Sequence, residues 1–493
     1  MKIGKFSLNL TSEVMVKVSK EVLTLFGIIV TGDDPDFDEM AVRHELLTDP
    51  APRVRTKLSL TDQAGRTELY ECESAGDGEE PVSAAFHRLV KLNFYQLLRR
   101  YCGMPPAPWG ILYGVRPVKI VHRYMERGMD RAAIERRLAK NFAVTPEKAR
   151  LLTDVALRQR PFLLSASAKD VSIYIGIPFC LSRCLYCSFP ANLLPNEARL
   201  ADFMQILEKD MRAVRSALTR YDLRVQSIYI GGGTPTSLPD HFFAALMEAV
   251  RQNFYSAGVA EVTVEAGRPD SMSPGKIKTL KDYHVTRVSV NPQTMQARTL
   301  KRIGRSHTPE DIVTMYHDLR TAGIASINMD VIVGLPGETR ADMADTMAKL
   351  ATLAPDDITL HTLALKRGSR LKMNLSETEL PTDEEVRAMY AIARESVARQ
   401  GMEPYYLYRQ GYQSGQLENV GCARPGAESL YNIQIMGERQ TILGIGGAAT
   451  SKIVNPRTER MKAAFNAKDL RSYLENIDTY IEKRASLLAE AYE

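Results

Sequence analysis

The run Val171-Ser-Ile-Tyr-Ile-Gly-Ile-Pro-Phe-Cys180-Leu-Ser-Arg-Cys184-Leu-Tyr-Cys187 places three cysteines directly after an apolar segment. Residues 171–177 form a short apolar stretch rich in β-branched side chains, which predicts a buried strand. Three thiolates on one loop can hold three irons of a [4Fe–4S] cube, which leaves the fourth iron with an open position. The loop therefore predicts a cluster that can coordinate an added molecule and pass an electron to it.

Two other interpretations of these cysteines stay open. A structural zinc site takes four protein ligands, whereas this loop supplies three cysteines and the histidine nearest in sequence is His241. A disulfide framework is typical of short secreted chains, whereas this chain has 493 residues and six cysteines. The scattered Cys72, Cys102 and Cys422 are predicted to be ordinary buried thiols.

Composition predicts a globular protein of two or three domains. The 493 residues are 44% hydrophobic and 25% charged, and the longest apolar stretch near the start, residues 22–30, is too short to span a bilayer. No segment at the start resembles a secretion signal, so we expect a cytoplasmic protein with reduced thiols. The net charge of +5 is spread over 64 basic and 59 acidic residues, which does not indicate a nucleic-acid partner.

The order of predicted elements indicates an α/β fold. Strand-like runs and helical stretches alternate from about residue 170, which predicts a partial (β/α)6 barrel with right-handed connections. The predicted strands are 171–177, 226–230, 261–265, 287–291, 326–333 and 357–363, and the helices between them include 198–217, 242–254 and 309–322.

The flanking regions have a different pattern. Strands at 2–10, 54–60 and 67–73 and a helix at 84–101 predict an N-terminal α+β module over 1–165, which ends near Arg160-Pro161 because a residue before proline avoids the helical region. The barrel is expected over 166–380 and a C-terminal accessory domain over 381–493. In that last part, 384–400 is predicted to be a helix, 405–412 a strand and 444–449 a small-residue turn.

Polar residues stand at the ends of the predicted barrel strands. Ile230-Gly-Gly-Gly-Thr-Pro-Thr236 ends the second strand, and its glycines allow a ligand to approach the backbone, although such a triplet also fits a tight turn. Later strands end near Glu265, Gln293, Arg305 and Asp330. Because the carboxyl ends of parallel strands meet at one edge, these residues are predicted to surround one ligand.

These motifs together resemble the radical S-adenosylmethionine (SAM) family of oxygen-independent coproporphyrinogen III oxidases. The resemblance is closest to the HemZ-type coproporphyrinogen dehydrogenases. These also share residues 109–119, Tyr405-Tyr-Leu-Tyr-Arg-Gln410, Glu418-Asn-Val-Gly421 and Pro425-Gly-Ala-Glu-Ser-Leu-Tyr-Asn432. The resemblance implies that Cys180, Cys184 and Cys187 hold a [4Fe–4S] cluster, and that SAM binds beside it, with a second SAM near the first. The SAM-binding residues that it implies are Tyr174, Gly232, Gly233, Thr234, Glu265, Gln293, Arg305, Asp330, Ile332 and Ala364.

The implied activity is the oxidative decarboxylation of coproporphyrinogen III to protoporphyrinogen IX in haem biosynthesis, with flavodoxin or ferredoxin as reducing partner. Propionate groups on such a substrate need cations, preferably arginine. The candidate cations are Lys366, Arg367, Arg409 and Arg424, each of which is also compatible with a plain surface charge.

Phe189 departs from the oxidase pattern. The resemblance implies a fourth cysteine at this position in oxidases and an aromatic residue in the related haem chaperones. A haem-binding chaperone is therefore an alternative function, and another radical SAM enzyme acting on a tetrapyrrole is a second alternative.

Overall fold

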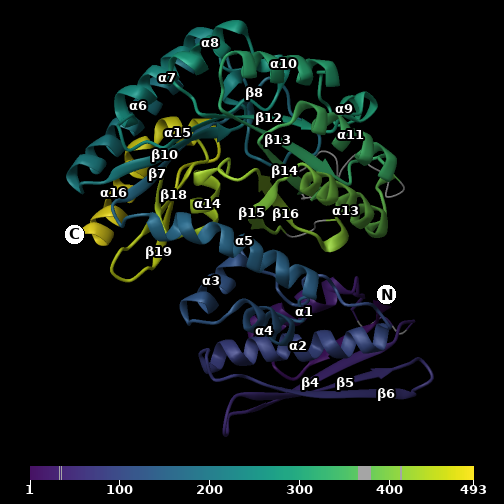
Figure 1. Ribbon diagram of the computed structural model, residues 1–493. Helices are drawn as coiled ribbons and strands as arrows, with labels where there is room; N and C mark the ends of the chain where they lie inside the picture. The colour runs from purple at the N-terminus through teal and green to yellow at the C-terminus, as the bar shows by residue number, and fades with distance from the viewer. Residues whose placement is uncertain (33, 35, 365–378, 411–413) are drawn as a thin grey trace. The chain divides into compact units, whose positions relative to one another are not determined.

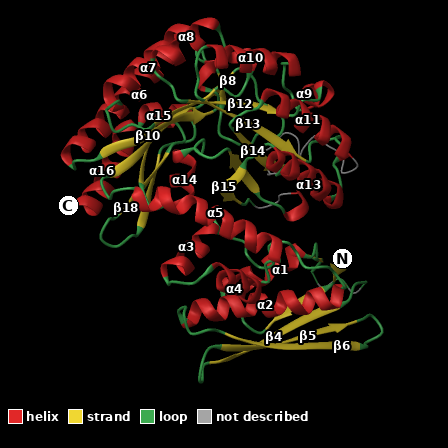
Figure 2. Ribbon diagram, in the orientation of Figure 1, coloured by secondary structure: helices red, strands yellow, loops and turns green. Residues whose placement is uncertain are grey.

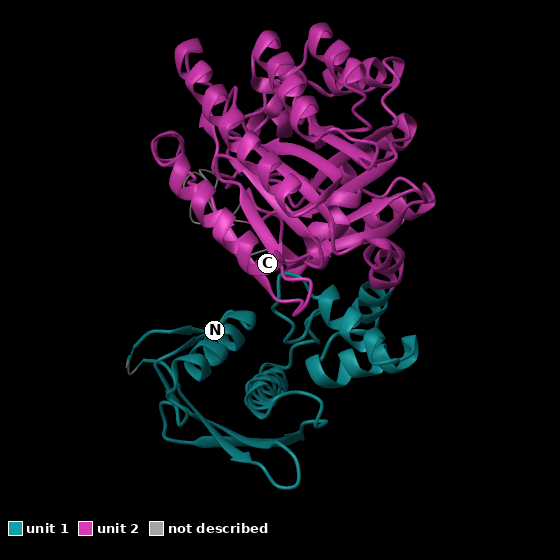
Figure 3. Ribbon diagram, turned by 90° about the vertical axis from the view of Figure 1, so that its left-hand side faces the viewer, with its two compact units in different colours: residues 1–153 teal, residues 154–493 magenta. Residues whose placement is uncertain are grey.

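The computed structural model describes the whole chain except residues 33, 35, 365–378 and 411–413. The described chain forms two compact units, residues 1–153 and 154–493, which Figure 3 colours separately. Each unit contains a hydrophobic core of its own. The division into three domains at 165 and 380 stays a prediction. None of the helices in the described parts of the chain is long and apolar enough to cross a bilayer.

Unit 1 is built on a four-stranded sheet with the order β2-β4-β5-β6. Alternate residues of β5 are buried, as expected of a strand with one face on a core, and helix α2 packs against it. The strands predicted at 54–60 and 67–73 and the helix predicted at 84–101 are confirmed. The bounds are β1 Lys2–Ile3, β2 Lys5–Leu8, α1 Glu13–Leu25, β3 Ile29–Val30, β4 Glu39–Leu47, β5 Arg53–Thr61, β6 Thr67–Ala75, α2 Val82–Cys102, α3 Val118–Glu126 and α4 Arg131–Phe142.

Helix α5, Pro146–Ser165, continues through Arg160-Pro161, so the expectation that the residue before proline leaves the helical region is wrong here. A proline inside a helix removes one backbone hydrogen bond, and side-chain anchors offset this loss. Arg158 binds Glu428 at 2.7 Å and donates to the Ala423 carbonyl at 3.1 Å. Gln159 donates to the Tyr405 carbonyl at 2.9 Å. These contacts hold the second half of α5 on the strands of unit 2.

Unit 2 contains the predicted partial (β/α)6 barrel. Six neighbouring strands, β7-β10-β11-β12-β13-β14, pair in parallel, and helices cover the outer face of the curved sheet (Figures 1 and 2). All six predicted strands are confirmed, and β11 and β13 have the predicted bounds. The strand bounds are β7 Asp170–Ile177, β10 Arg224–Gly232, β11 Glu261–Glu265, β12 Arg287–Gln293, β13 Ser326–Val333 and β14 Asp357–Thr362.

The barrel helices follow their strands in sequence, which gives the β/α alternation. Their apolar faces supply much of the unit's core, together with the buried sides of the strands. The helix bounds are α6 Glu197–Arg220, α7 Asp240–Phe254, α8 Pro274–Asp282, α9 Ala297–Arg302, α10 Pro309–Thr321, α11 Arg340–Leu353 and α13 Asp383–Arg399, with short helices η1 Pro235–Ser237, η2 Pro269–Ser271 and η4 Ser414–Gln416.

The C-terminal strands extend the barrel sheet at both edges, which gives eleven strands in the order β15-β16-β14-β13-β12-β11-β10-β7-β17-β18-β19. Strand β17 pairs in parallel with β7, so the turn predicted at 444–449 is wrong for its first three residues. Gly444 is needed because a Cβ there would lie 2.6 Å from the Thr450 backbone of β18. The bounds are β15 Glu403–Tyr408, β16 Asn419–Ala423, α14 Leu430–Gly437, β17 Thr441–Gly446, β18 Thr450–Val454, β19 Met461–Phe465, α15 Leu470–Glu475 and α16 Ile477–Tyr492.

Candidate iron–sulfur and cofactor site

The three-cysteine loop lies at the carboxyl end of β7. Its start is fixed by a short pair of strands, β8 Phe179–Cys180 and β9 Asn192–Leu193, and by a hydrogen bond from the Leu194 amide to the Cys180 carbonyl at 3.1 Å. The Cys187 amide donates to the Cys184 carbonyl at 3.2 Å, which closes a tight turn between the second and third cysteines. All three thiols are free and half-buried, so one loop offers three sulfur ligands.

This donor set suits a cubane cluster. Among the described residues, no three His, Cys, Asp or Glu side chains converge as ligands of a single metal ion would. A cubane differs from such an ion because each thiolate binds its own iron, so separate thiols on one loop fit it. Burial raises the pKa of the Cys180 and Cys187 thiols, and iron must therefore displace their protons when a cluster assembles.

Arg268 links the cysteine loop to the third barrel strand, and it was missed in the sequence. Its guanidinium donates to Ser182 Oγ at 2.6 Å and to the Ser182 carbonyl at 3.1 Å, and it lies 4.0 Å from Cys184 Sγ. It also binds Asp270 through two hydrogen bonds, of 2.9 and 2.5 Å. Only 3% of Arg268 is exposed, so this cation is a fixed part of the loop's surroundings. The sole sequence signal is its place just after Glu265.

The glycine triplet forms the neighbouring strand end. A Cβ on Gly233 would lie 2.4 Å from the Phe179 carbonyl oxygen, and Gly232 has φ +113°. Thr234 follows, and its amide donates to the Phe179 carbonyl at 2.7 Å while its hydroxyl lies 3.6 Å from Cys180 Sγ. The glycines therefore allow the backbone of β10 to pass directly beside the cysteine loop.

Glu265 lies next to this triplet at the end of β11. Its carboxylate accepts hydrogen bonds from Tyr229 Oη at 2.7 Å and from the Gly232 amide at 3.2 Å. Burial raises the pKa of Glu265 to about 7, although both hydrogen bonds act in the opposite direction. The Tyr229 ring stacks on Tyr174 at 6.2 Å and on Tyr431 of α14 at 4.4 Å between centroids. Tyr431 is a further residue of this site that the sequence analysis missed.

Gln293 at the end of β12 and Arg305 in the loop after α9 each present an unpaired polar atom. Gln293 has φ +65° and lies where the β12–β13 pairing shifts its register. Its Oε1 and the Nε of Arg305 are buried and have no hydrogen-bond partner among the described residues. The remaining nitrogens of Arg305 donate to Tyr186 Oη at 3.3 Å and to the Gly267 carbonyl at 2.6 Å. Buried polar atoms are rarely left unpaired, so these two indicate a ligand face.

The other predicted cofactor residues lie on the next two strands. Asp330 is on β13, with Oδ2 3.5 Å from His361 Nε2 of β14. Ile332 is 6% exposed and packs with Leu335 and Leu363, and Ala364 follows the end of β14. The structure thus brings the predicted SAM residues to the side of the barrel where the parallel strands β7 to β14 have their carboxyl ends.

The predicted substrate cations are not all on this side. Arg409 directly follows β15, which runs in the same direction as the barrel strands. It therefore lies on the side where these strands have their carboxyl ends, as Asp330 does. Arg424 lies on the opposite side, at the amino ends of the barrel strands. It follows antiparallel β16 and donates from Nε to the carbonyl of Pro355, which precedes β14, at 3.2 Å. Lys366 and Arg367 fall outside the described residues.

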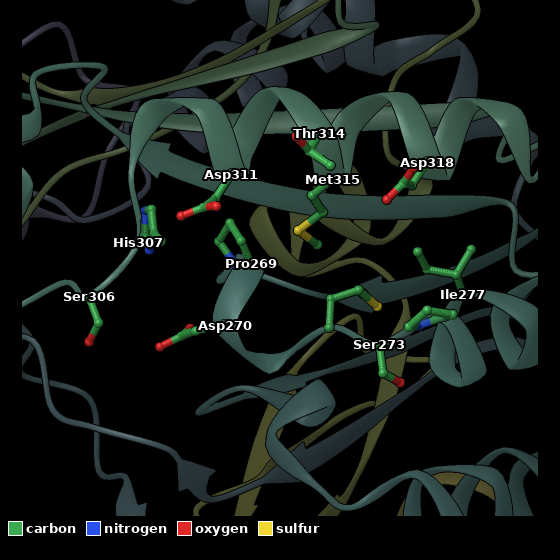
Figure 4. Close-up of a pocket in the computed structure, with 12 residues that line it drawn as sticks. Pro269, Asp270, Ser273, Ile277, Ser306, His307, Asp311, Thr314, Met315 and Asp318 are labelled. Atoms are coloured by element: carbon green, nitrogen blue, oxygen red, sulfur yellow. The ribbon is translucent and has the colours of Figure 1, made fainter.

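A pocket of about 300 Å³ lies beside this site and contains none of the predicted residues (Figure 4). His307 lines it, and burial lowers the pKa of this imidazole to about 4, which keeps it neutral at neutral pH. The lining residues are Pro269, Asp270, Met272, Ser273, Pro274, Ile277, Ser306, His307, Asp311, Thr314, Met315 and Asp318.

Comparison with known proteins identifies the class. Residues 174–350 match the family model described as the radical SAM superfamily. The fold resembles that of coproporphyrinogen III oxidase (HemN) from Escherichia coli, with a TM-score of 0.53 and 22% identity over 66% of this chain and 72% of that one. The protein is a member of the radical SAM superfamily, and this membership supports a general assignment as an oxidoreductase.

A relative from Bacillus subtilis that is similar over most of both chains identifies the family. The oxygen-independent coproporphyrinogen-III oxidase-like protein HemZ of Bacillus subtilis (strain 168) is 39% identical over 82% of this chain and 81% of its own. Heme chaperone HemW of Escherichia coli (strain K12) is 29% identical over 58% of this chain and 71% of its own. The chain belongs to the oxygen-independent coproporphyrinogen III oxidase family, with a HemZ-type relative. Its predicted cofactors, a [4Fe–4S] cluster and SAM, are confirmed by this membership.

Proposed function

We propose that this protein decarboxylates coproporphyrinogen III oxidatively to protoporphyrinogen IX and consumes SAM. Two propionates of the substrate each lose a β-hydrogen atom, CO2 and one electron, and they become vinyl groups. The observation that carries the proposal is the joint presence of the three-cysteine loop and the polar strand ends in a chain that is 39% identical to a coproporphyrinogen-III oxidase-like protein. A small reducing protein such as flavodoxin or ferredoxin supplies the electrons.

The chain provides the cofactor site from successive strands. Cys180, Cys184 and Cys187 would hold the cluster, which, when bound and reduced, supplies the electron that converts SAM to a 5′-deoxyadenosyl radical. Glu265 offers a carboxylate to the ammonium group of SAM, and Asp330 accepts hydrogen bonds from its ribose hydroxyls.

Arg409 is the described cation that we propose for the substrate. It lies on the same side of the barrel as the cofactor residues, where a guanidinium can bind a propionate through two parallel hydrogen bonds. Arg424 is not part of this proposal because it lies on the opposite side. Lys366 and Arg367 remain predictions.

A haem-binding chaperone is the second candidate function. Phe189, at the place where oxidases of the family are expected to have a fourth cysteine, is 63% exposed. An exposed aromatic ring beside the cysteine loop offers a flat apolar surface to a macrocycle. The 29% identity with heme chaperone HemW agrees with this second candidate.

One anaerobic experiment separates the two candidates. The reconstituted protein is incubated with coproporphyrinogen III, SAM and a reductant, and vinyl products and SAM consumption are measured. Vinyl products that are lost in Cys184→Ala, but kept in the control Cys72→Ala outside the loop, support the decarboxylase. Stoichiometric haem binding without vinyl products overturns it in favour of the chaperone. Loss of the haem Soret band with SAM consumption indicates another tetrapyrrole-modifying enzyme.

A further inference from the structure

The carboxylate of Asp330 is held at both oxygens. Oδ1 accepts a hydrogen bond from Asn328 Nδ2 at 2.8 Å, and Oδ2 faces His361 Nε2 at 3.5 Å. Burial raises the pKa of Asp330, but the hydrogen bond and charge interaction with His361 and the hydrogen bond from Asn328 outweigh burial, so the pKa is lowered overall. The side chain is therefore an ionised carboxylate with a fixed orientation.

The first chain of hydrogen bonds that leads to Asp330 starts at Tyr406 on β15, outside the six barrel strands. Tyr406 Oη lies 3.1 Å from the Thr359 hydroxyl, which donates to Asn328 Oδ1 at 3.2 Å. Strand β16 lies between β15 and β14, so the Tyr406 ring must pass over it to reach Thr359. Gly421 of β16 makes this possible, because a Cβ there would lie 1.8 Å from Tyr406 Cε1.

The second chain of contacts that leads to Asp330 starts at Tyr408, also on β15. Tyr408 Oη lies 3.3 Å from His361 Nδ1. In the tautomer that donates from Nε2 to the Asp330 carboxylate, Nδ1 is an acceptor for the Tyr408 hydroxyl. Tyr406 and Tyr408 are two residues apart on one strand and thus share a face. Tyr408 is connected to Oδ2 of Asp330 through His361, and Tyr406 to Oδ1 through Thr359 and Asn328.

We propose that His361, Tyr406 and Tyr408 are positioning residues for SAM, which fix the Asp330 carboxylate in the orientation that its ribose hydroxyls require. This inference rests on the proposed function through the assignment of Asp330 to the ribose. Each carboxylate oxygen keeps a further lone pair for a hydroxyl donor. A carboxylate that is already ordered loses less conformational entropy when the ligand binds, and this raises affinity without a new contact.

The test measures SAM affinity by anaerobic calorimetry on protein with an intact cluster, as shown by iron and sulfide content. His361→Phe removes both hydrogen bonds and is expected to weaken SAM binding about threefold to tenfold. His361→Gln keeps a donor toward Asp330 and is expected to restore most of the affinity. His317→Gln, on an exposed position of α10, is the control and is expected to bind SAM like the parent.

A double-mutant cycle with Asp330→Asn shows whether His361 acts through Asp330. The effect of His361→Phe is expected to disappear in the Asp330→Asn background, whereas equal effects in both backgrounds overturn the proposal. If His361→Phe does not keep its cluster, Tyr408→Phe serves as the test instead. We expect its SAM affinity to fall about twofold to fivefold, and an unchanged affinity overturns the proposal. If Asp330→Asn binds SAM like the parent, the assignment of Asp330 to the ribose is wrong. If Asp330→Asn binds weakly while the His361 and Tyr408 variants bind like the parent, the ribose assignment stands and the positioning role is wrong.

Discussion

Glu265 is expected to reduce the stability of the protein in the absence of SAM. Its carboxyl pKa is raised from 4.5 to about 7, mainly because burial disfavours the charged form. Between these two values the unfolded chain releases its proton while the folded protein keeps it. Stability therefore falls as pH rises through this window, and above pH 7 the loss is complete. Glu265→Gln cannot ionise and avoids this loss.

The size of the effect follows from the rise in the Glu265 pKa. A pKa difference of one corresponds to about 1.4 kcal/mol, so the rise from 4.5 to about 7 represents about 3 kcal/mol. Because Glu265 is only half-buried by its accessible surface, solvent screening reduces this figure, and we expect a gain of about 1–3 kcal/mol in Glu265→Gln at pH 8. No gain is expected below about pH 3.5, where the carboxyl is protonated in both states.

Urea unfolding of SAM-free protein at pH 5, 6.5 and 8 measures this gain. The same variant should bind SAM more weakly, because the amide offers no charge to the ammonium group. In the parent, SAM affinity should rise as pH increases through about 7, since the bound ligand favours the ionised carboxylate. A variant that is less stable than the parent at pH 8 would refute the reasoning, because the carboxylate would then be a net stabilising group.

Two further substitutions test the packing behind the site. Arg484→Met should lower the free energy of unfolding by about 3–5 kcal/mol, because it leaves the fully buried Asp210 carboxylate without its cation. Adding Asp210→Asn should recover part of this loss in thermal melting, and an unchanged melting temperature in the single variant contradicts the prediction. Gly421→Ala should displace the Tyr406 ring and weaken SAM binding while the iron content stays constant. Parental SAM affinity in Gly421→Ala would show that the chain of hydrogen bonds from Tyr406 has no effect on Asp330.

Local patterns were enough to predict the barrel strands. Each combines a short apolar run with a polar or glycine-rich end, and burial on both faces makes such runs continuous. Strand β17 was missed because Gly444 and Gly446 suggest a turn, whereas glycine serves there for close contact with neighbouring strands. The side on which a C-terminal strand joins the sheet depends on pairing between distant segments, which no local pattern records. For this reason Arg424 was expected beside the substrate but lies on the opposite side.

The candidate site was predictable where residue type and strand end coincide, as for the cysteines, Glu265 and Asp330. The residues that hold these groups were not predictable. His361 and Tyr408 contact each other across two strands that are 47 residues apart in sequence, and Tyr406 reaches Thr359 only because Gly421 lacks a side chain. Arg268 was missed because its partners, Ser182 and Cys184, lie on a different loop.

The pairing of β7 with β17 also constrains the order in which the chain folds. Ser172 on β7 donates a hydrogen bond to Gln440, which is 268 residues later in the sequence and stands directly before β17. Until that later segment has been synthesised, β7 has an open edge, and the cysteine loop that follows it lacks one of its neighbouring strands. Contacts this distant in sequence form slowly, and open strand edges promote association between chains. Strand β7 therefore acquires both of its neighbouring strands only after nearly the whole of unit 2 has been synthesised.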